Sequence, residues 1–289
     1  MKILVIGAEG QLGNEIKQQS RFSEHTFVYA DIAGDGDDVK VLDITDPQQV
    51  KLAVSNDYDV IVNCAAYNEV DKAEDDDTQA IRLNVEAVAN IAQAAKAADA
   101  LLIHFSTDYV YDGKANVPYT EEDTPAPLNA YGRSKLAGEK AVQESGCRYM
   151  IFRTSWLYSL TGRNFFKTMA DKCAECPSIK VVCDQVGTPT NAHDLAYLVM
   201  HVIGSGQLDK TGIYHYSNEG VASWYDFAKE INDKLGYTCD VQPCRTGEYP
   251  RKAVRPCYSV MDKNKVKKTF GIQVPHWRES LYVLVREYL

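Results

Sequence analysis

The sequence predicts an α/β fold: a doubly wound parallel sheet accompanied by a smaller mixed α/β lobe. In the first half, short apolar runs alternate with longer helix-like segments, as in repeated βα units. These runs are apolar at nearly every position, which is expected of strands covered on both faces. The second half contains more prolines, aromatic residues and short helices. With 289 residues and 45% hydrophobic content, the chain can bury one large core or two joined ones.

Five strands are expected in order along the first half. They are the runs 2–7, 26–31, 59–66, 101–107 and 147–155. A helix is expected to begin near Gln11, and another segment begins at Pro47. Between the third and fourth runs, apolar residues recur at helical spacing, which predicts a long amphipathic helix there; they are Ile81, Val85, Val88, Ile91 and Ala92.

The second half divides its elements between the two lobes. Later strands near 178–203 and 212–217 are expected to join the main sheet, and a helix is expected from Trp224 to Leu235. We therefore expect residues 1–155 to form the larger lobe, with those later strands added to it. Residues 156–289 are expected to form mainly the smaller lobe.

Charge and composition exclude several classes of protein. The formal net charge of −9 argues against binding to nucleic acid, which needs clustered Lys and Arg. No apolar stretch is long enough to span a bilayer, and the first run turns into glycine rather than continuing as a signal-peptide core. We expect a cytoplasmic protein. Its 8 cysteines suit reduced thiols, including the pair Cys173 and Cys176.

A glycine loop connects the first strand to the first helix. Gly7, Gly10 and Gly13 provide the tight turn and the close backbone approach that a pyrophosphate requires. Asp31 ends the second strand, where a carboxylate can accept hydrogen bonds from an adenosine ribose. The loop predicts a Rossmann-like nucleotide site; a tight turn without a ligand is the alternative. Asp31 favours NADH over NADPH, because a 2′-phosphate would be repelled.

The fourth strand ends in a polar cluster, "STDYVYDG", and Tyr131 and Lys135 follow at helical spacing. A carbonyl reduced by hydride needs a proton donor, a second hydrogen-bond donor and a nearby cation. Tyr131, Thr107 and Lys135 offer these, with Lys135 expected to lower the pKa of Tyr131. Ser106 is an alternative to Thr107, because strand alternation should aim only one of them at the site. A solvated surface pair is the alternative for Tyr131 and Lys135.

These features resemble the extended short-chain dehydrogenase/reductase superfamily. Several longer stretches resemble more closely the dTDP-4-dehydrorhamnose reductase family. They are "GAEGQLG", "NCAAYNEVDKAE", "STDYVYDG", "YGRSKLAGE", "RTSWLYS", "DQVGTPTNAHDLA", "GIYHYSNEGVASWYDFA" and "RPCYSVMD". The similarity covers nearly the whole chain. Cys64 and Asn68 depart from the family pattern near the cofactor.

The resemblance implies roles for individual residues. Thr107, Tyr131 and Lys135 match the catalytic triad, and Tyr131 and Lys135 would also contact the cofactor. Asp108, Tyr109 and Trp156 match the deoxysugar pocket, and Arg255 would meet the nucleotide diphosphate. The remaining cofactor contacts would be Gly7, Gly10, Gln11, Leu12, Asp31, Asp43, Ile44, Ala65, Ala66 and Tyr67. The alternatives are a helix cap for Asp43, a core anchor for Trp156 and a surface ion pair for Arg255.

The implied activity is reduction of the C4 ketone of dTDP-4-dehydro-β-L-rhamnose by NADH or NADPH, the last step of dTDP-L-rhamnose biosynthesis. The larger lobe would bind NAD(P) and the smaller lobe the sugar nucleotide. Other members of the superfamily are epimerases or dehydratases, and some relatives are non-catalytic regulatory subunits; these stay open as alternatives. The family contains monomers and magnesium-bridged homodimers. Glu15 suits such a bridge, but the sequence assigns no Mg²⁺ ligand.

Overall fold

A parallel sheet forms the centre of the computed structural model, which describes residues 1–54 and 58–289. Within these residues the sheet has seven strands in the order β11-β6-β5-β4-β1-β2-β3, and every neighbouring pair is parallel. The strands are β1 (Lys2–Ile6), β2 (Thr26–Asp31), β3 (Val39–Val41), β4 (Val60–Asn63), β5 (Leu101–Thr107), β6 (Arg148–Thr154) and β11 (Gly212–His215). The predicted fold class is confirmed.

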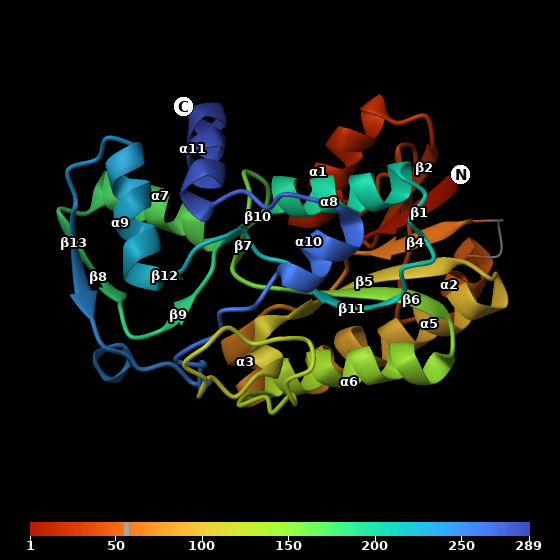
Figure 1. Cartoon of the computed structure of the whole chain (residues 1–289), viewed down its shortest axis with the longest axis horizontal. Coiled ribbons are helices and arrows are strands. Elements are labelled where there is room, and N and C mark those ends of the chain that lie inside the picture. Colours follow the sequence, from red (N-terminus) through yellow and green to blue (C-terminus); the bar gives the residue numbers. More distant parts are fainter. Residues whose placement is uncertain (55–57) are drawn as a thin grey trace.

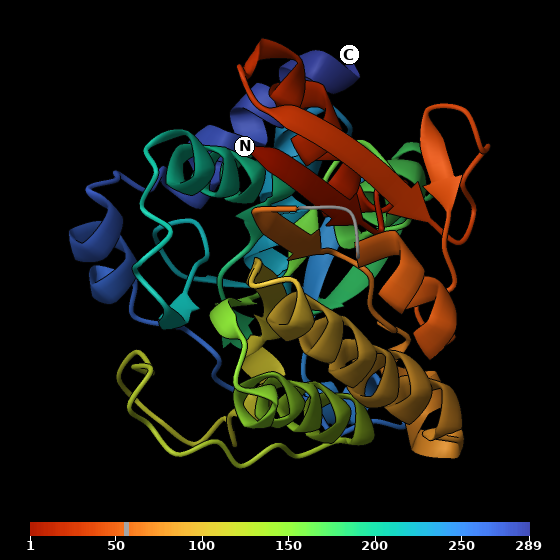
Figure 2. The same ribbon diagram turned by 90° about the vertical axis from the view of Figure 1, so that its right-hand side faces the viewer.

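Helices cover both faces of this sheet (Figures 1 and 2). One face carries α1 (Gln11–Gln19), α8 (Ala192–Gly204) and α10 (Asn264–Phe270), and the other carries α2 (Pro47–Val54), α5 (Ala87–Ala97) and α6 (Ala130–Ser145). Alternation along β1 explains the two layers. Ile3 and Val5 pack in the core with α1 and α8, whereas Leu4 and Ile6 pack in the core with α2 and α5.

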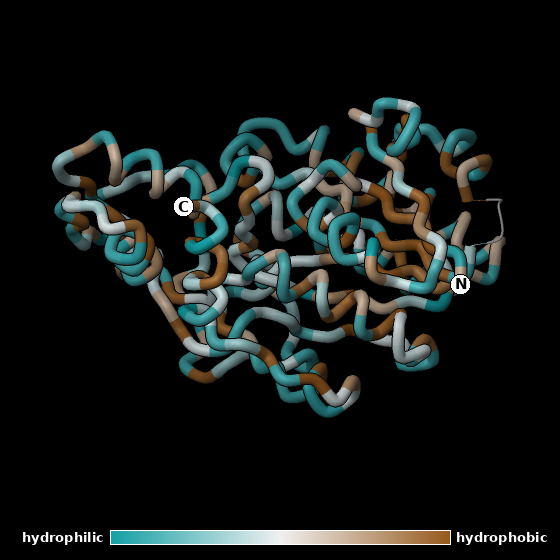
Figure 3. Tube along the Cα trace, turned by 90° about the horizontal axis from the view of Figure 1, so that it is seen from above, coloured by the Kyte–Doolittle hydropathy of each residue, from teal (hydrophilic) through white to brown (hydrophobic). Residues whose placement is uncertain are grey.

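The smaller lobe has its own core. In this lobe α7 (Phe165–Glu175), α9 (Trp224–Lys234) and α11 (Trp277–Tyr288) pack with β8 (Ser178–Val182) and β13 (Asp240–Cys244) around Phe166, Phe227 and Trp277. Two short strand pairs join it, β7 (Leu157–Tyr158) with β10 (Thr190–Asn191) and β9 (Val186–Gly187) with β12 (Ala222–Ser223). Figure 3 shows hydrophobic stretches along the interior strands and hydrophilic stretches along the outer loops.

Short helical elements complete the chain. They are η1 (Ser20–Phe22), α3 (Val70–Asp75), α4 (Thr78–Ile81), η2 (Arg82–Glu86), η3 (Asp108–Val110) and η4 (Thr246–Glu248). The turn η3 immediately follows β5, and α3 packs against α6. The turn η3 is therefore part of the polar cluster that ends β5.

One strand assignment from the sequence is wrong. The segment 178–203 adds no strand to the main sheet: β8 pairs with β13, and residues 192–204 form α8. The segment 212–217 does supply an added strand, since β11 pairs with β6. An apolar run indicates a strand, but its partner depends on contacts far away in the sequence.

The sheet reverses its winding between β1 and β4. From β1 the chain continues outward to β2 and β3, and it then returns to β4 and winds outward through β5 and β6 on the other side. In open α/β sheets, ligands bind in the crevice beyond the carboxyl ends of the strands at such a reversal. The ends of β1, β4 and β5 are thus the expected place for a site.

None of the helices within the described residues has the length and apolar character needed to cross a membrane.

Candidate active site

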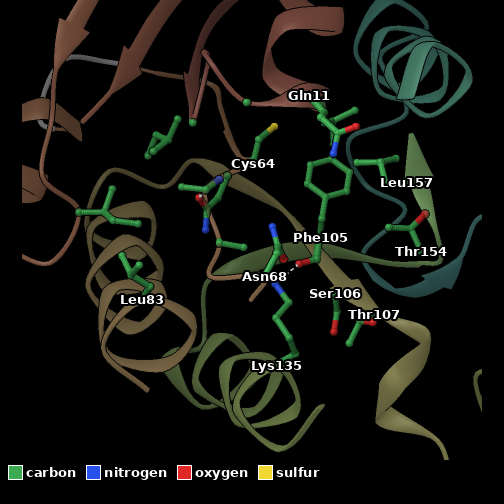
Figure 4. Close-up of a pocket in the computed structure, with 18 of the residues that line it drawn as sticks. Gln11, Cys64, Asn68, Leu83, Phe105, Ser106, Thr107, Lys135, Thr154 and Leu157 are labelled. Atoms are coloured by element: carbon green, nitrogen blue, oxygen red, sulfur yellow. Dashed lines mark hydrogen bonds between the residues drawn. The ribbon is translucent and has the colours of Figure 1, made fainter. Parts of the chain in front are cut away.

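A cavity of about 750 Å³ opens at this reversal point (Figure 4). It is lined by the ends of β1, β2, β4, β5 and β6, by the glycine loop and by the start of α6. Its size is in the range of small-molecule sites. Nearly all the candidate cofactor residues line it: Gly7, Gly10, Gln11, Leu12, Asp31, Asp43, Ile44, Ala65, Ala66, Tyr131 and Lys135.

The glycine loop is shaped for close approach of a ligand. Gly7 has φ of +78°, and a Cβ there would lie 2.6 Å from the backbone nitrogen of Ala65. A Cβ on Gly13 would collide with the carbonyl oxygen of Gly7. Gly10 begins α1 without a side-chain cap, so the first N–H groups of the helix can meet an anion. This cradle fits the pyrophosphate of a dinucleotide.

Acidic residues lie at the ends of β2 and β3. The Asp31 carboxylate accepts backbone hydrogen bonds from Glu9 at 3.0 Å and Ala33 at 3.0 Å, which fixes it beside the glycine loop. Asp43 also lines the cavity, but its Oδ1 accepts from the backbone and hydroxyl of Thr45, and these hydrogen bonds lower its pKa. Asp43 therefore stabilises a local turn through Thr45 and also lines the cavity.

Tyr67 differs from the other candidate cofactor residues because it is absent from the cavity lining. Its ring packs in a small cluster with Ala73, Ala80 and Tyr131. Its backbone N–H and C=O both bond to the Asn84 side chain, so Asn84 has a structural role beside the cavity. Tyr67 thus packs against Tyr131 outside the cavity lining and helps to hold its ring in place.

Tyr131 and Lys135 lie in the first two turns of α6. The helix is capped by Asn129, whose side chain accepts from Gly132 N, and Glu74 accepts a hydrogen bond from Ala130 N. Lys135 Nζ donates to the carbonyl oxygen of Phe105 at 2.7 Å, and burial lowers the pKa of Lys135 to about 8. The ammonium is thereby held against the end of β5.

Burial raises the pKa of Tyr131, and an interaction with the Thr107 side chain only partly opposes this rise. The sequence-based expectation that Lys135 lowers this pKa is not what the structure shows: burial raises it, and the groups that modify it are Thr107 and Asp108. The phenol keeps its proton at neutral pH, as a proton donor must. Its hydroxyl lies 3.3 Å from Asn68 Oδ1, and its ring meets Tyr109 edge to face.

The end of β5 brings both hydroxyl candidates to the cavity. Ser106 and Thr107 each line it, and Figure 4 shows them beside Lys135. The Ser106 hydroxyl has no hydrogen-bond partner among the described residues. Thr107 accepts from Tyr109 N and donates to Asp108 Oδ1, both at 3.1 Å. Thr107 is the one that interacts with Tyr131.

The candidate substrate residues separate into two groups. Asp108 and Trp156 line the cavity, whereas Tyr109 and Arg255 are absent from its lining. Trp156 has φ of +48° and stacks on Trp224 of α9 with ring centroids 3.5 Å apart, so it also packs within the smaller lobe. Arg255 forms a two-pronged ion pair with Asp71, at 3.0 and 2.9 Å. The ion-pair alternative for Arg255 is therefore the arrangement seen.

The structure adds cavity residues that sequence reasoning did not assign. They include Leu42, Asn63, Cys64, Leu83, Phe105, Thr154, Ser155, Leu157 and Leu195. Most of them lie at or just beyond the carboxyl end of a strand, and this position is the signal that could have identified them. Leu195 comes from α8, whose packing over β1 could not be seen in the sequence.

Glu15, the candidate for a metal bridge, lies outside any cluster of metal ligands among the described residues. Within residues 1–54 and 58–289, no group of three or more His, Cys, Asp or Glu side chains is placed to hold a metal ion. Glu15 Oε2 lies 3.3 Å from His193 Nδ1. This contact raises the pKa of His193.

The Rossmann-like sheet and the cavity at its carboxyl edge are those of an oxidoreductase that uses a nicotinamide cofactor. The glycine cradle, the Asp31 carboxylate beside it and the Tyr131–Lys135 pair are compatible with that cofactor. The family model described as the RmlD substrate binding domain matches residues 1–289. The chain belongs to this family.

Individual relatives of this chain are described as dTDP-4-dehydrorhamnose reductases, in agreement with the family model. A dTDP-4-dehydrorhamnose reductase of Sinorhizobium fredii is 37% identical over 301 residues, covering 99% of this chain and 97% of that protein. The crystal structure of such a reductase from Clostridium acetobutylicum is 40% identical, with a TM-score of 0.93, covering 100% and 99% of the two chains. A reductase from Bacillus anthracis in complex with NADP is 36% identical, with a TM-score of 0.89 and 99% coverage of both chains.

Proposed function

We propose that this protein reduces the C4 ketone of dTDP-4-dehydro-β-L-rhamnose to dTDP-L-rhamnose, the last step of dTDP-L-rhamnose biosynthesis. The observation that carries the proposal is the meeting of Thr107, Tyr131 and Lys135 at one cavity beside the glycine loop. Full-length relatives at 36 to 37% identity are described as dTDP-4-dehydrorhamnose reductases. The alternatives are another keto-sugar nucleotide and a non-catalytic regulatory subunit.

In the proposed mechanism each side chain has one task. The bound nicotinamide supplies the hydride that C4 receives. Tyr131 donates its proton to the oxygen of the former ketone, and Thr107 donates a hydrogen bond to that oxygen. Lys135, held at the end of β5 by the Phe105 carbonyl, stabilises the phenolate that remains. Asp108 and Trp156 would face the deoxysugar, since both line the cavity.

Arg255 has a modified role in this proposal. Its guanidinium is committed to Asp71, so the pair as a unit would lie beside the nucleotide diphosphate. Tyr109 interacts with Arg255 and contacts Tyr131. These contacts connect the nucleotide end of the proposed substrate site to the proton donor.

Turnover tests this function directly. Purified protein is mixed with dTDP-4-dehydrorhamnose generated in situ and with NADH or NADPH, and the loss of nicotinamide absorbance is followed. We expect cofactor oxidation matched one to one by dTDP-rhamnose. Binding of both ligands without oxidation would instead favour the regulatory-subunit alternative, and oxidation only with another keto sugar would reassign the substrate.

The preference for NADH is also a proposal, supported by the charges around the cavity. Lys135 is the basic side chain among the described residues that line it, and it lies at the β5 end; Glu9, Asp31 and Asp43 lie at the adenosine end. A 2′-phosphate would therefore meet like charge. The NADP complex of the Bacillus anthracis relative makes NADPH a necessary comparison.

Replacing Asp31 should shift this preference. In Asp31→Asn, loss of one negative charge is expected to raise kcat/KM for NADPH relative to NADH by about tenfold, from roughly 1 kcal/mol or more of relieved repulsion. Glu24→Gln, an exposed residue elsewhere, is the control and should leave the ratio unchanged. The ratio of kcat/KM values measures the effect. An unchanged ratio in Asp31→Asn would remove Asp31 as the discriminating residue.

The two lobes are proposed to divide the binding of cofactor and substrate. Residues 1–155, together with β11, would form the NAD(P)-binding lobe, and residues 156–289 would mainly bind the sugar nucleotide. We propose that the protein is cytoplasmic and is a monomer or a homodimer. Light scattering in the presence and absence of Mg²⁺ would distinguish the two oligomeric states.

A further inference from the structure

Asp108 is a buried carboxyl group inside the cavity wall. It follows Thr107 directly, is 2% exposed and lines the same cavity as Tyr131 and Lys135. No ion pair within the described residues includes it. Because an unpaired charge is costly to bury, the protonated form of Asp108 is favoured. Burial raises its pKa to about 7, although Ser259 and Thr107 favour the charged form.

Polar groups that line one cavity connect this carboxyl group to the proton donor. The Thr107 hydroxyl is 3.1 Å from Asp108 Oδ1, and Thr107 lines the cavity together with Tyr131, with whose phenol it interacts. The Tyr131 hydroxyl also lies 3.3 Å from Asn68 Oδ1. Thr107 is therefore the central member of a Tyr131–Thr107–Asp108 row. A hydroxyl can accept one proton while it donates another, so the row can pass a proton in either direction.

The second carboxyl oxygen of Asp108, Oδ2, is buried and has no hydrogen-bond partner among the described residues that would hold its proton. Ser259, from the smaller lobe, approaches the same carboxyl group. A buried carboxyl group in a cavity wall, with one oxygen that has no hydrogen-bond partner among the described residues, needs an explanation beyond fold stability.

The charged groups nearby do not remove the proton from Asp108. Lys135 points to the Phe105 carbonyl oxygen, and Arg255 is paired with Asp71. Tyr109, which adjoins Asp108 in η3, and Tyr131 from α6 are both phenols whose pKa is raised first by burial and then by the Asp108 charge, so both stay neutral. Burial is therefore what favours the neutral form of Asp108, and neither Lys135 nor Arg255 is paired with it.

We propose that Asp108 supplies the proton that restores Tyr131 after each turnover, through the Thr107 hydroxyl. The inference rests on the proposed function. When Tyr131 has given its proton to the substrate oxygen, the phenolate takes the Thr107 hydroxyl proton, and Thr107 takes the Asp108 carboxyl proton. Asp108 is left as a carboxylate and regains a proton from solvent. The net consumption is one proton for each hydride transferred.

Asp108→Asn tests the relay because the amide keeps the size and hydrogen bonding of the carboxyl group but carries no acidic proton. The first turnover uses the proton already on Tyr131. Because Asp108 would also face the deoxysugar, the comparison is made at saturating keto sugar. There we expect the single-turnover rate constant for hydride transfer to fall much less than kcat, which should fall at least about tenfold. A burst of one cofactor oxidised per site should therefore precede slow turnover.

Two results would overturn the proposal. One is an unchanged kcat in Asp108→Asn; the other is an equal fall of the single-turnover rate and kcat, which indicates a role in substrate binding or orientation. Asp112→Asn, a partly exposed carboxylate four residues later, is the matched control and should show neither burst nor slowing. Melting temperature and cofactor binding establish that each variant is folded.

The wild-type protein gives a second test that does not depend on folding of a variant. As the pH rises through about 7, Asp108 loses its proton, and kcat should fall while single-turnover hydride transfer stays constant until Lys135 titrates near 8. Coincident pH profiles would contradict the relay. Absence of any hydride transfer in wild type would instead indicate failure of the proposed function.

Discussion

Tyr131→Phe should reduce kcat by about 10² to 10⁴-fold, the usual contribution of a positioned general acid. The phenol is the proton donor in the proposed reaction, and its raised pKa keeps it protonated at neutral pH. Phenylalanine retains the ring that meets Tyr109 edge to face and packs beside Ala130. Only the hydroxyl is lost, together with its long hydrogen bond to Asn68 and its interaction with Thr107.

The measurement is steady-state oxidation of NADH and NADPH with the keto sugar, beside a binding titration of each cofactor. Tyr149→Phe is the control, because it removes a phenol from β6 outside the cavity lining. It should retain wild-type kcat. If Tyr131→Phe retained more than about one tenth of wild-type kcat, the proton would have to come from another group, and Asp108 would be the first candidate.

The larger lobe was predicted well because its strands and its glycine loop are each specified by a short continuous stretch of sequence. A run such as Leu101–Thr107 is buried at every position, so its apolar composition marks both ends of β5. The glycine loop likewise needs residue types that can be read directly: a Cβ on Gly7 or Gly13 would collide with the backbone. Candidate residues at strand ends therefore converged in one cavity as expected.

The sequence did not reveal contacts between residues that lie far apart along the chain. The strand β8 was expected in the main sheet, but it pairs with β13, some 60 residues later. Arg255 was expected to meet a diphosphate, and that role stays a prediction; the sequence did not reveal that Asp71, 184 residues away in sequence, pairs with it. The effect of Lys135 on Tyr131 was judged from helical spacing alone. Burial, which decides the Tyr131 pKa, depends on the whole fold.

Glu139→Gln should lower the free energy of unfolding by about 3 to 5 kcal/mol, because it leaves a buried guanidinium without its counter-ion. Glu139 and Arg153 are 1% and 3% exposed. Arg153 Nε and Nη2 donate to the two carboxylate oxygens at 2.9 and 2.7 Å, and Nη1 donates to the Tyr111 hydroxyl at 2.7 Å. Urea unfolding measures the loss.

Asp233→Asn provides the contrast, since it breaks an exposed pair with Lys229 and should cost less than about 1 kcal/mol. Replacing both buried partners, in Glu139→Leu with Arg153→Met, should recover much of the stability lost in Glu139→Gln, because no unpaired charge remains. Equal losses in Glu139→Gln and in the exposed control would contradict a desolvated pair.

The same pair also affects the chemistry of the site. Glu139 lies one helical turn after Lys135, and its charge raises the Lys135 pKa against the lowering effect of burial. In Glu139→Gln that pKa should fall below about 8, so the ammonium would be lost at lower pH. Single-turnover hydride transfer should then decline at a lower pH than in wild type. A purely structural pair would reduce stability without moving this alkaline limb, so the pH profile distinguishes the two roles.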